Sequence, residues 1–225
     1  MRVLITGTDT GVGKTWVACG LVRALRDASK RVVAIKPVEA GRSGTPSDWE
    51  DGARLARATG QEQPSHAIVR LPHQGAPILA GEGPESPIDY DALLLKLERY
   101  LQGTEFGLIE GIGGLLTPLT WEWNATDLAR DLGAGALVVA EDRLGTINHT
   151  LLTLSALELA GIPCAGVILT TPDVTDRSTG LNAPAIARLS GIDRVLVLPR
   201  SADPNDSAAT MAEVIGWLTR VGAPA

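Results

Sequence analysis

The sequence predicts one doubly wound α/β domain over residues 1–225, with a mostly parallel sheet. Short runs rich in valine, isoleucine and leucine alternate with segments of helical period, which is typical of repeated βαβ units. Most of the apolar runs lack polar alternation, as strands do when helices cover both faces of their sheet. No internal repeat and no long polar linker divides the chain, so one domain accounts for the whole pattern.

The expected strands are short and lie between turn signals. In chain order they are Val3–Ile5, Val32–Ile35, Phe106–Ile109, Ala136–Val139, Ala165–Leu169 and Val195–Leu198. The segments of helical period are Lys14–Ala28, Trp49–Thr59, Tyr90–Tyr100, Ala125–Leu132, Thr146–Ala160, Ala183–Ser190 and Ala208–Val221. An insertion over Arg42–Asp89 is rich in glycine, proline and serine, and we expect one helix in it.

A glycine-rich loop, GTDTGVGKT, follows the first expected strand and leads into the first helix. Its glycines allow backbone N–H groups to surround a phosphate, Lys14 brings a cation to the outer phosphates, and the Thr15 hydroxyl can bind Mg²⁺. Five residues separate Gly7 from Gly13, where the usual pattern has four. Strand, loop and helix occur in the required order, which predicts a fold of the P-loop NTPase type with ligands at the carboxyl ends of the strands.

Three charged residues are candidates for the same edge of the sheet. Lys36 ends a strand and precedes a proline that keeps it extended, so its ammonium can reach the anion bound by Lys14. Glu110 ends the third expected strand, where its carboxylate suits a Mg²⁺ ligand opposite Thr15. From position alone, Lys36 could also be a solvated lysine and Glu110 a surface or capping residue. Asp51 begins a helix, and its position by itself favours capping over metal binding.

Composition argues against several classes of partner. The net charge of −6 and the scattered basic residues make nucleic acid an unexpected partner. The longest apolar stretch, around Ala134–Ala140, is far below the roughly 18 residues that cross a bilayer. Met1 leads almost directly into a strand without a signal-peptide pattern, so we expect a cytoplasmic protein. Cys19 and Cys164 have no metal-like spacing and are expected to be reduced.

Four motifs together resemble the dethiobiotin synthetase family. They are the P-loop with its extra residue, Lys36-Pro37-Val38, the run Glu110–Gly114, and the string LGTINHTLLT over Leu144–Thr153. The last is the most specific, because general phosphate binding does not demand it. The resemblance implies an enzyme that forms the cyclic urea of dethiobiotin from 7,8-diaminononanoate, CO₂ and ATP with Mg²⁺. It also implies a homodimer.

The resemblance further implies roles for individual residues. Lys14 would hold the β- and γ-phosphates, Lys36 the carbamate and the transferring phosphoryl group, and Thr10 would donate from its hydroxyl. Thr15, Asp51 and Glu110 correspond to the Mg²⁺ ligands of the family. The nucleotide-binding residues carried over are Gly11, Val12, Gly13, Lys14, Thr15, Trp16, Glu110, Gly113, Thr170, Thr171, Pro199, Arg200 and Ser201. Those for the diamino acid are Ala40, Gly145, Thr146, Ile147 and Asn148, the last four on a helix N-terminus from the other subunit that holds the carboxylate tail.

Two of the departures from the family pattern bear directly on binding. Ala40 lies where relatives often supply a hydroxyl for the substrate amines, and Thr170 or Thr171 lies where an asparagine reads adenine. A regulatory P-loop ATPase switch of the partitioning or site-selection type is the alternative. Such switches typically have a second lysine early in the P-loop, whereas Thr6–Gly11 contains none. Their membrane-targeting versions have a basic C-terminus, whereas Ala208–Ala225 contains Arg220 as its only cation.

Overall fold

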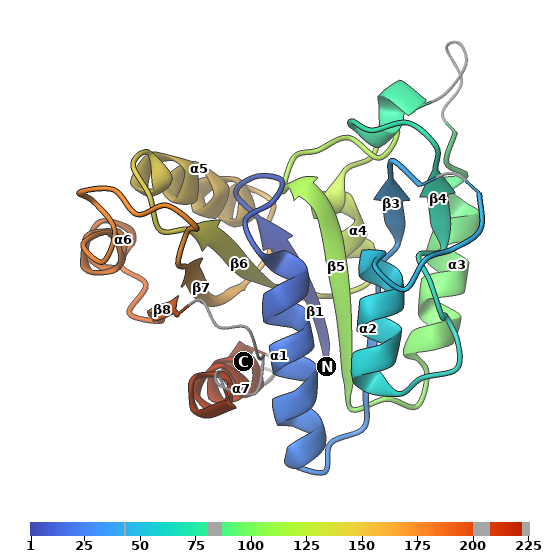
Figure 1. Ribbon diagram of the computed structural model, residues 1–225, viewed down its shortest axis with the longest axis horizontal. Coiled ribbons are helices and arrows are strands. Elements are labelled where there is room, and N and C mark those ends of the chain that lie inside the picture. Colours follow the sequence, from blue (N-terminus) through green and yellow to red (C-terminus); the bar gives the residue numbers. More distant parts are fainter. Residues whose placement is uncertain (43, 81–86, 200–207, 222–225) are drawn as a thin grey trace.

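The computed structural model describes residues 1–42, 44–80, 87–199 and 208–221. Its main sheet has six strands in the order β2-β5-β1-β6-β7-β8, and every pair of neighbours is parallel (Figure 1). The strands are β1 (Arg2–Gly7), β2 (Val32–Ile35), β5 (Phe106–Gly114), β6 (Gly135–Glu141), β7 (Cys164–Thr170) and β8 (Val195–Leu198). The helices are α1 (Lys14–Asp27), α2 (Asp51–Thr59), α3 (Tyr90–Leu101), α4 (Ala125–Asp131), α5 (Thr146–Leu159), α6 (Asn182–Ser190) and α7 (Ala208–Val221).

Two apolar cores lie on opposite faces of this sheet. One joins the sheet to α3, α4, α5 and α6, and the other joins it to α1, α2 and α7 (Figure 1). Neighbouring residues of β1 illustrate the alternation, because Leu4 packs into the first core and Val3 and Ile5 pack into the second. Burial on both faces explains why the strands read as continuous apolar runs. The predicted doubly wound α/β fold of the P-loop type is confirmed.

The insertion contains more regular structure than its composition indicates. Its helix α2 begins at Asp51 rather than Trp49, and a second small sheet pairs β3 (Val38–Ala40) with β4 (Val69–Leu71) in parallel. A short 3₁₀ helix covers Pro77–Ala80. Strands of three residues give too little periodicity to be seen in a sequence, and this pair forms only because the tertiary fold brings two distant segments together.

The expectation that Glu110 ends its strand is wrong. Strand β5 continues to Gly114, and Glu110 lies in its interior opposite Ile5. The cause is that β1 also extends further, to Gly7, which pairs with Gly114 after a shift in register. Gly113 in this strand needs to be a glycine, because its φ is 62° and a Cβ on it would lie only 2.5 Å from the Thr117 hydroxyl oxygen, too close for a side chain.

Among the described residues, none of the helices combines the length and the apolar character that crossing a membrane requires.

Candidate active site

The carboxyl ends of β1, β2 and β5 open into a cavity of about 760 Å³. Parallel strands place their carboxyl ends at one edge of the sheet, so residues from distant segments meet there. The cavity brings together most of the predicted phosphate, metal and catalytic residues. They are Thr10, Gly11, Gly13, Lys14, Thr15, Trp16, Lys36, Asp51, Glu110 and Gly113, and Ala40, predicted for the diamino acid, also lines the cavity.

The P-loop of the cavity has the backbone that a phosphate cradle needs. Gly11 and Gly13 have φ angles of 79° and 90°, which side chains with a Cβ rarely adopt. The Lys14 ammonium donates hydrogen bonds to the carbonyl oxygens of Asp9 at 2.9 Å and Gly113 at 2.8 Å. Burial, assisted by the charge of Lys36, lowers the pKa of Lys14 to about 8. The loop therefore holds a buried cation at the start of a helix, where phosphate groups bind favourably.

A second buried lysine lies beside the P-loop. Lys36 Nζ donates to Glu110 Oε1 at 2.6 Å and to the Gly111 carbonyl oxygen at 3.1 Å. The Thr15 hydroxyl donates to the same Glu110 oxygen at 2.8 Å. Burial acts to lower the pKa of Lys36, but the charges of Glu110 and Asp51 outweigh it and raise that pKa above its ordinary value. The protonated form of Lys36 is therefore favoured, and the residue is buried rather than the solvated lysine that its position also allowed.

The oxygen groups around Lys36 fit a magnesium ion. Asp51 Oδ2 lies 3.4 Å from Lys36 Nζ, which places its carboxylate beside Glu110 and Thr15. Glu110 Oε2 is buried and has no hydrogen-bond partner, so one carboxylate oxygen remains to be satisfied. Mg²⁺ typically takes one or two carboxylates together with substrate phosphates and water. In the described part of the chain, no group of three or more histidine, cysteine, aspartate or glutamate side chains is arranged for a metal.

A smaller cavity of about 360 Å³ adjoins the P-loop on the side of β7. Trp16 and Pro199 line it together with Thr170 and Thr171. The two threonine hydroxyls donate to backbone oxygens, Thr170 to Val12 at 2.9 Å and Thr171 to Leu198 at 3.3 Å. Val12 is buried and is not among the residues that line this cavity. Arg200 and Ser201, which were also expected here, lie outside the described residues.

The expected carboxylate-binding residues lie away from both cavities. Gly145 precedes α5 with a φ of 93°, and Thr146, Ile147 and Asn148 form its first turn. Helix geometry leaves the N–H groups of a first turn without intrahelical partners, so this end can bind an anion. No wall of the 760 Å³ cavity includes these residues.

Sequence reasoning missed three charged residues of the larger cavity, Glu39, Arg42 and Arg54. Glu39 stands next to the Lys36-Pro37-Val38 motif, but nothing local indicates what its side chain faces. Arg54 lies one turn after Asp51 on α2, and their nearest nitrogen and oxygen atoms are 3.9 Å apart. The opposite charges of Asp51 and Arg54, three residues apart on one helix, were the one sequence signal that could have indicated Arg54.

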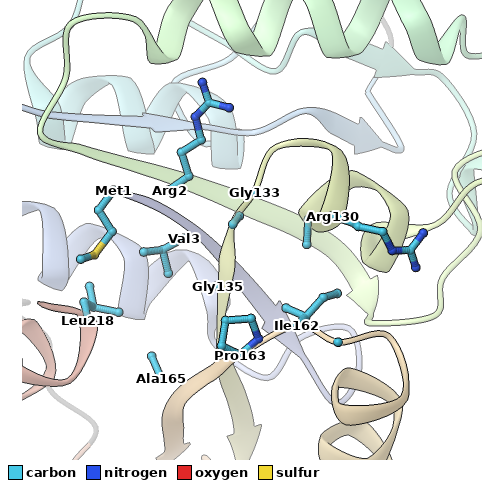
Figure 2. A pocket seen from close by; sticks show the side chains of 13 residues that line it. Met1, Arg2, Val3, Arg130, Gly133, Gly135, Ile162, Pro163, Ala165 and Leu218 are labelled. Atoms are coloured by element: carbon cyan, nitrogen blue, oxygen red, sulfur yellow. The ribbon is translucent and has the colours of Figure 1, made fainter. Parts of the chain in front are cut away.

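A separate cavity of about 360 Å³ lies at the amino-terminal edge of the sheet, near Met1 (Figure 2). Figure 2 shows apolar side chains and two arginines in its wall. Arg2 donates to the Leu132 carbonyl oxygen and Arg130 to Asp127. None of the predicted site residues lines it.

Sheet order, P-loop and cavity together define this chain as a P-loop α/β domain of the nucleotide-binding class. A family model described as an AAA domain matches residues 1–207. The fold is similar to the septum site-determining protein MinD complexed with Mg-ADP from Pyrococcus horikoshii, with a TM-score of 0.57, 16% identity and full coverage of both chains. It is also similar to the MinC:MinD cell division protein complex of Aquifex aeolicus, with a TM-score of 0.60, 15% identity and coverage of 100% and 98%. Identities this low show the fold alone.

The chain belongs to the ATP-dependent dethiobiotin synthetase family. It is 42% identical to ATP-dependent dethiobiotin synthetase BioD of Anaeromyxobacter dehalogenans over 95% of this chain and 96% of that protein. It is 35% identical to the protein of the same name from Aquifex aeolicus over 96% and 97%. The resemblance drawn from the four motifs is confirmed, and the regulatory switch is not favoured, because the MinD proteins share only the fold.

Proposed function

We propose that this chain closes the cyclic urea of dethiobiotin from 7,8-diaminononanoate and CO₂, converting ATP to ADP and phosphate, as a step of biotin biosynthesis. Its membership of the dethiobiotin synthetase family supports this reaction. The observation that carries it is the meeting of two buried lysines, Lys14 and Lys36, at one cavity with a P-loop. A reaction in which anions form and transfer a phosphoryl group needs such fixed positive charge.

In the proposed sequence, one amine of the substrate takes up CO₂ as a carbamate. A carbamate oxygen attacks the γ-phosphate to form a carbamic-phosphoric anhydride, and ADP leaves. The second amine then attacks the carbonyl carbon, closes the ring and releases phosphate. No residue has to activate water, so exclusion of water from the cavity matters more than a general base.

Lys14, Lys36 and Thr10 are the proposed catalytic residues. Lys14 binds the β- and γ-phosphates, and its position between two carbonyl oxygens holds it at the mouth of the P-loop. Lys36 stays protonated, so it stabilises charge on the carbamate and the transferring phosphoryl group and does not act as a base. Thr10 lines the cavity. In this proposal, its hydroxyl donates a hydrogen bond to the phosphoryl group.

Thr15, Asp51 and Glu110 are the residues that we propose to hold Mg²⁺. The ion would screen phosphate charge and polarise the γ-phosphoryl group. Glu110 contributes a carboxylate fixed by hydrogen bonds from Thr15 and Lys36. Asp51, at the start of α2, contributes the second carboxylate.

The nucleotide and the diamino acid occupy different parts of the edge in this proposal. The backbone of Gly11–Gly13 surrounds the phosphates, and the smaller cavity beside Trp16 and Thr170 receives the base. Ala40 lines the cavity where the substrate amines lie, and as an alanine it offers them no hydroxyl.

A homodimer is part of the proposal, with the carboxylate tail held by Gly145–Asn148 of the partner. Helix α5 supports it, because apolar residues occur around most of its circumference. Leu152 and Leu159 are 61% and 90% exposed, and Leu144 just before the helix is 76% exposed. Apolar side chains gathered on one element favour burial against a second molecule.

We further propose that residues 1–225 form one dethiobiotin synthetase-like domain that works in the cytoplasm without nucleic acid or membrane partners. The single main sheet and the family model over residues 1–207 support one domain. The net charge of −6 supports the absence of a nucleic-acid partner.

A product assay tests the function. The protein receives diaminononanoate, bicarbonate and MgATP, and dethiobiotin is sought by mass, with each component omitted in turn. We expect the product only in the complete mixture. ATP hydrolysis without the diamine should be slow and should rise sharply when diamine and CO₂ are both present. A fast hydrolysis that ignores the diamine would remove the synthetase function.

A further inference from the structure

Glu39 is a buried carboxylate on β3 whose side chain faces the start of helix α2. It is 3% exposed and has no role in the proposed chemistry. Its Oε1 atom accepts hydrogen bonds from the Asp51 N–H at 2.8 Å and from Arg42 Nε at 2.9 Å. Its Oε2 atom accepts from the Gly52 N–H at 3.1 Å. One carboxylate therefore binds the first two N–H groups of α2.

Helix α2 lacks a cap from its own sequence. The residue at its N-cap position is Glu50, whose side chain makes no capping hydrogen bond. The Glu50 carboxylate instead pairs with Arg70, with nitrogen–oxygen distances of 2.6 and 2.8 Å. A helix start needs acceptors for its free N–H groups, and negative charge is favourable there. Glu39 supplies both from a strand twelve positions earlier in the chain.

The start of α2 is also fixed on its other side. A Cβ on Gly52 would lie 2.2 Å from the Ala67 backbone nitrogen, so the helix backbone touches the loop before β4 directly. The hydrogen bonds of Glu39 and this close contact leave the first turn little room to shift. Asp51 is the first residue of that turn, and its carboxylate lies in the cavity 3.4 Å from Lys36 Nζ.

We propose that Glu39 is a positioning residue, which caps α2 from β3 and thereby sets the Asp51 carboxylate for the metal–nucleotide complex. This inference rests on the proposed role of Asp51 as a magnesium ligand. Partners that orient a metal ligand typically change metal affinity by 10- to 100-fold when they are removed. Both oxygens of Glu39 already accept N–H hydrogen bonds, three in all, which favours action through Asp51 over direct metal binding.

Binding of Mn²⁺ to the ADP complex of the full-length protein, followed by electron paramagnetic resonance, tests this without turnover. Glu39→Ala should weaken Mn²⁺ binding about tenfold, while ADP affinity without metal stays within about twofold. Glu39→Asp keeps the charge but withdraws the carboxylate by one methylene, and it should weaken Mn²⁺ binding about threefold. If Glu39→Ala does not fold, the Mn²⁺ affinity of Glu39→Asp tests the proposal instead.

Asp89→Ala is the matched control. The Asp89 carboxylate caps α3 by accepting from the Ala92 N–H at 2.9 Å, far along the chain from Asp51. This variant should lose thermal stability and keep its Mn²⁺ affinity within about twofold. If it weakens Mn²⁺ binding as much as Glu39→Ala does, the effect is a general consequence of losing a helix cap and the proposal fails.

A double-mutant cycle separates Glu39 from the proposed function. Asp51→Asn should weaken Mn²⁺ binding, and adding Glu39→Ala to it should have less than about a twofold further effect, because the ligand that Glu39 positions is gone. If Asp51→Asn weakens binding and Glu39→Ala does not, only the positioning role is wrong. If Asp51→Asn leaves Mn²⁺ affinity unchanged, the metal role of Asp51 is wrong and the positioning role falls with it.

Discussion

Lys36 Nζ lies 2.6 Å from Glu110 Oε1, and the two side chains are only 4% and 1% exposed. The lysine follows β2 and the glutamate lies within β5, two neighbouring strands of the sheet. Their ion pair joins the proposed phosphoryl-stabilising cation to a proposed magnesium ligand. Substitution of Lys36 therefore tests both its proposed role in turnover and its contribution to the stability of the fold.

Lys36→Gln should nearly abolish turnover while ADP and ATP affinities stay within about tenfold. The reason is that Lys36 is proposed to act on charge that develops in the transition state, so its loss lowers kcat more than it weakens binding. Lys14→Gln is the comparison, because Lys14 binds ground-state phosphates and its loss should weaken both. Steady-state kinetics and calorimetric nucleotide binding measure the two effects. Equal losses of affinity in both variants would contradict the assignment.

The stability of Lys36→Gln should fall further than that of the parent between pH 5 and pH 8, because the pKa of Glu110 is already above its ordinary value of 4.5 in the parent and should rise again without Lys36. Burial raises the pKa of Glu110, and Lys36 is the strongest influence that lowers it. Without Lys36, the folded variant holds the Glu110 proton up to a higher pH than the folded parent does, while the unfolded chain releases it, so rising pH favours unfolding more in the variant. Urea denaturation at pH 5 and pH 8 checks this. A difference between variant and parent that does not change with pH would contradict it.

Nucleotide binding should take up protons near pH 8. The pKa of Lys14 is lowered to about 8, chiefly by burial, and bound phosphates would raise it again. At pH 8 Lys14 should therefore take up about half a proton per ADP, and almost none at pH 6.5. Calorimetry in two buffers of different ionisation enthalpy measures this uptake. Lys14→Arg, whose charge does not titrate, should lose it, and equal uptake by both proteins would assign the proton to another group.

The preference for ATP over CTP or GTP should be at most about 1 to 2 kcal/mol, the value of one hydrogen bond. Contacts to the phosphates do not distinguish one base from another. The hydroxyls of Thr170 and Thr171 already donate hydrogen bonds to backbone oxygens. Values of kcat/KM for the three nucleotides measure the preference. Thr170→Val should reduce all three alike, because its hydroxyl binds the Val12 carbonyl of the P-loop. A preference beyond about a hundredfold would show that another group reads adenine.

Ile147→Asp should raise the KM for the diamine much more than the KM for ATP. An acidic side chain in the first turn of α5 repels the carboxylate tail that this helix end is proposed to bind, whereas the P-loop lies elsewhere. Steady-state kinetics with each substrate varied in turn measure the two KM values.

In the parent protein, specific activity should fall as the proposed dimer is diluted and dissociates. Activity against protein concentration, alongside sedimentation, measures this. A fully active monomer would exclude a site shared between subunits.

The sequence by itself determined the fold class, the presence of all six strands of the main sheet, and the P-loop. Each depends on local information, because buried parallel strands read as apolar runs and a P-loop is one contiguous stretch between strand and helix. The cavity also contains Lys36, which follows β2 at the edge where carboxyl ends of parallel strands meet, and Asp51 and Glu110, which the family resemblance implied for the same site. The chemical roles of these residues stay predictions.

Only the tertiary structure decided the features that join distant segments. Glu110 lies within β5 because β1 extends to Gly7 and shifts its register, which no local pattern records. The Thr170 hydroxyl donates a hydrogen bond to the Val12 carbonyl oxygen of the P-loop, and Glu39 caps a helix that begins twelve residues later. A hydrogen bond depends on direction and on tenths of an ångström, and between remote segments both are set by how helices and strands pack.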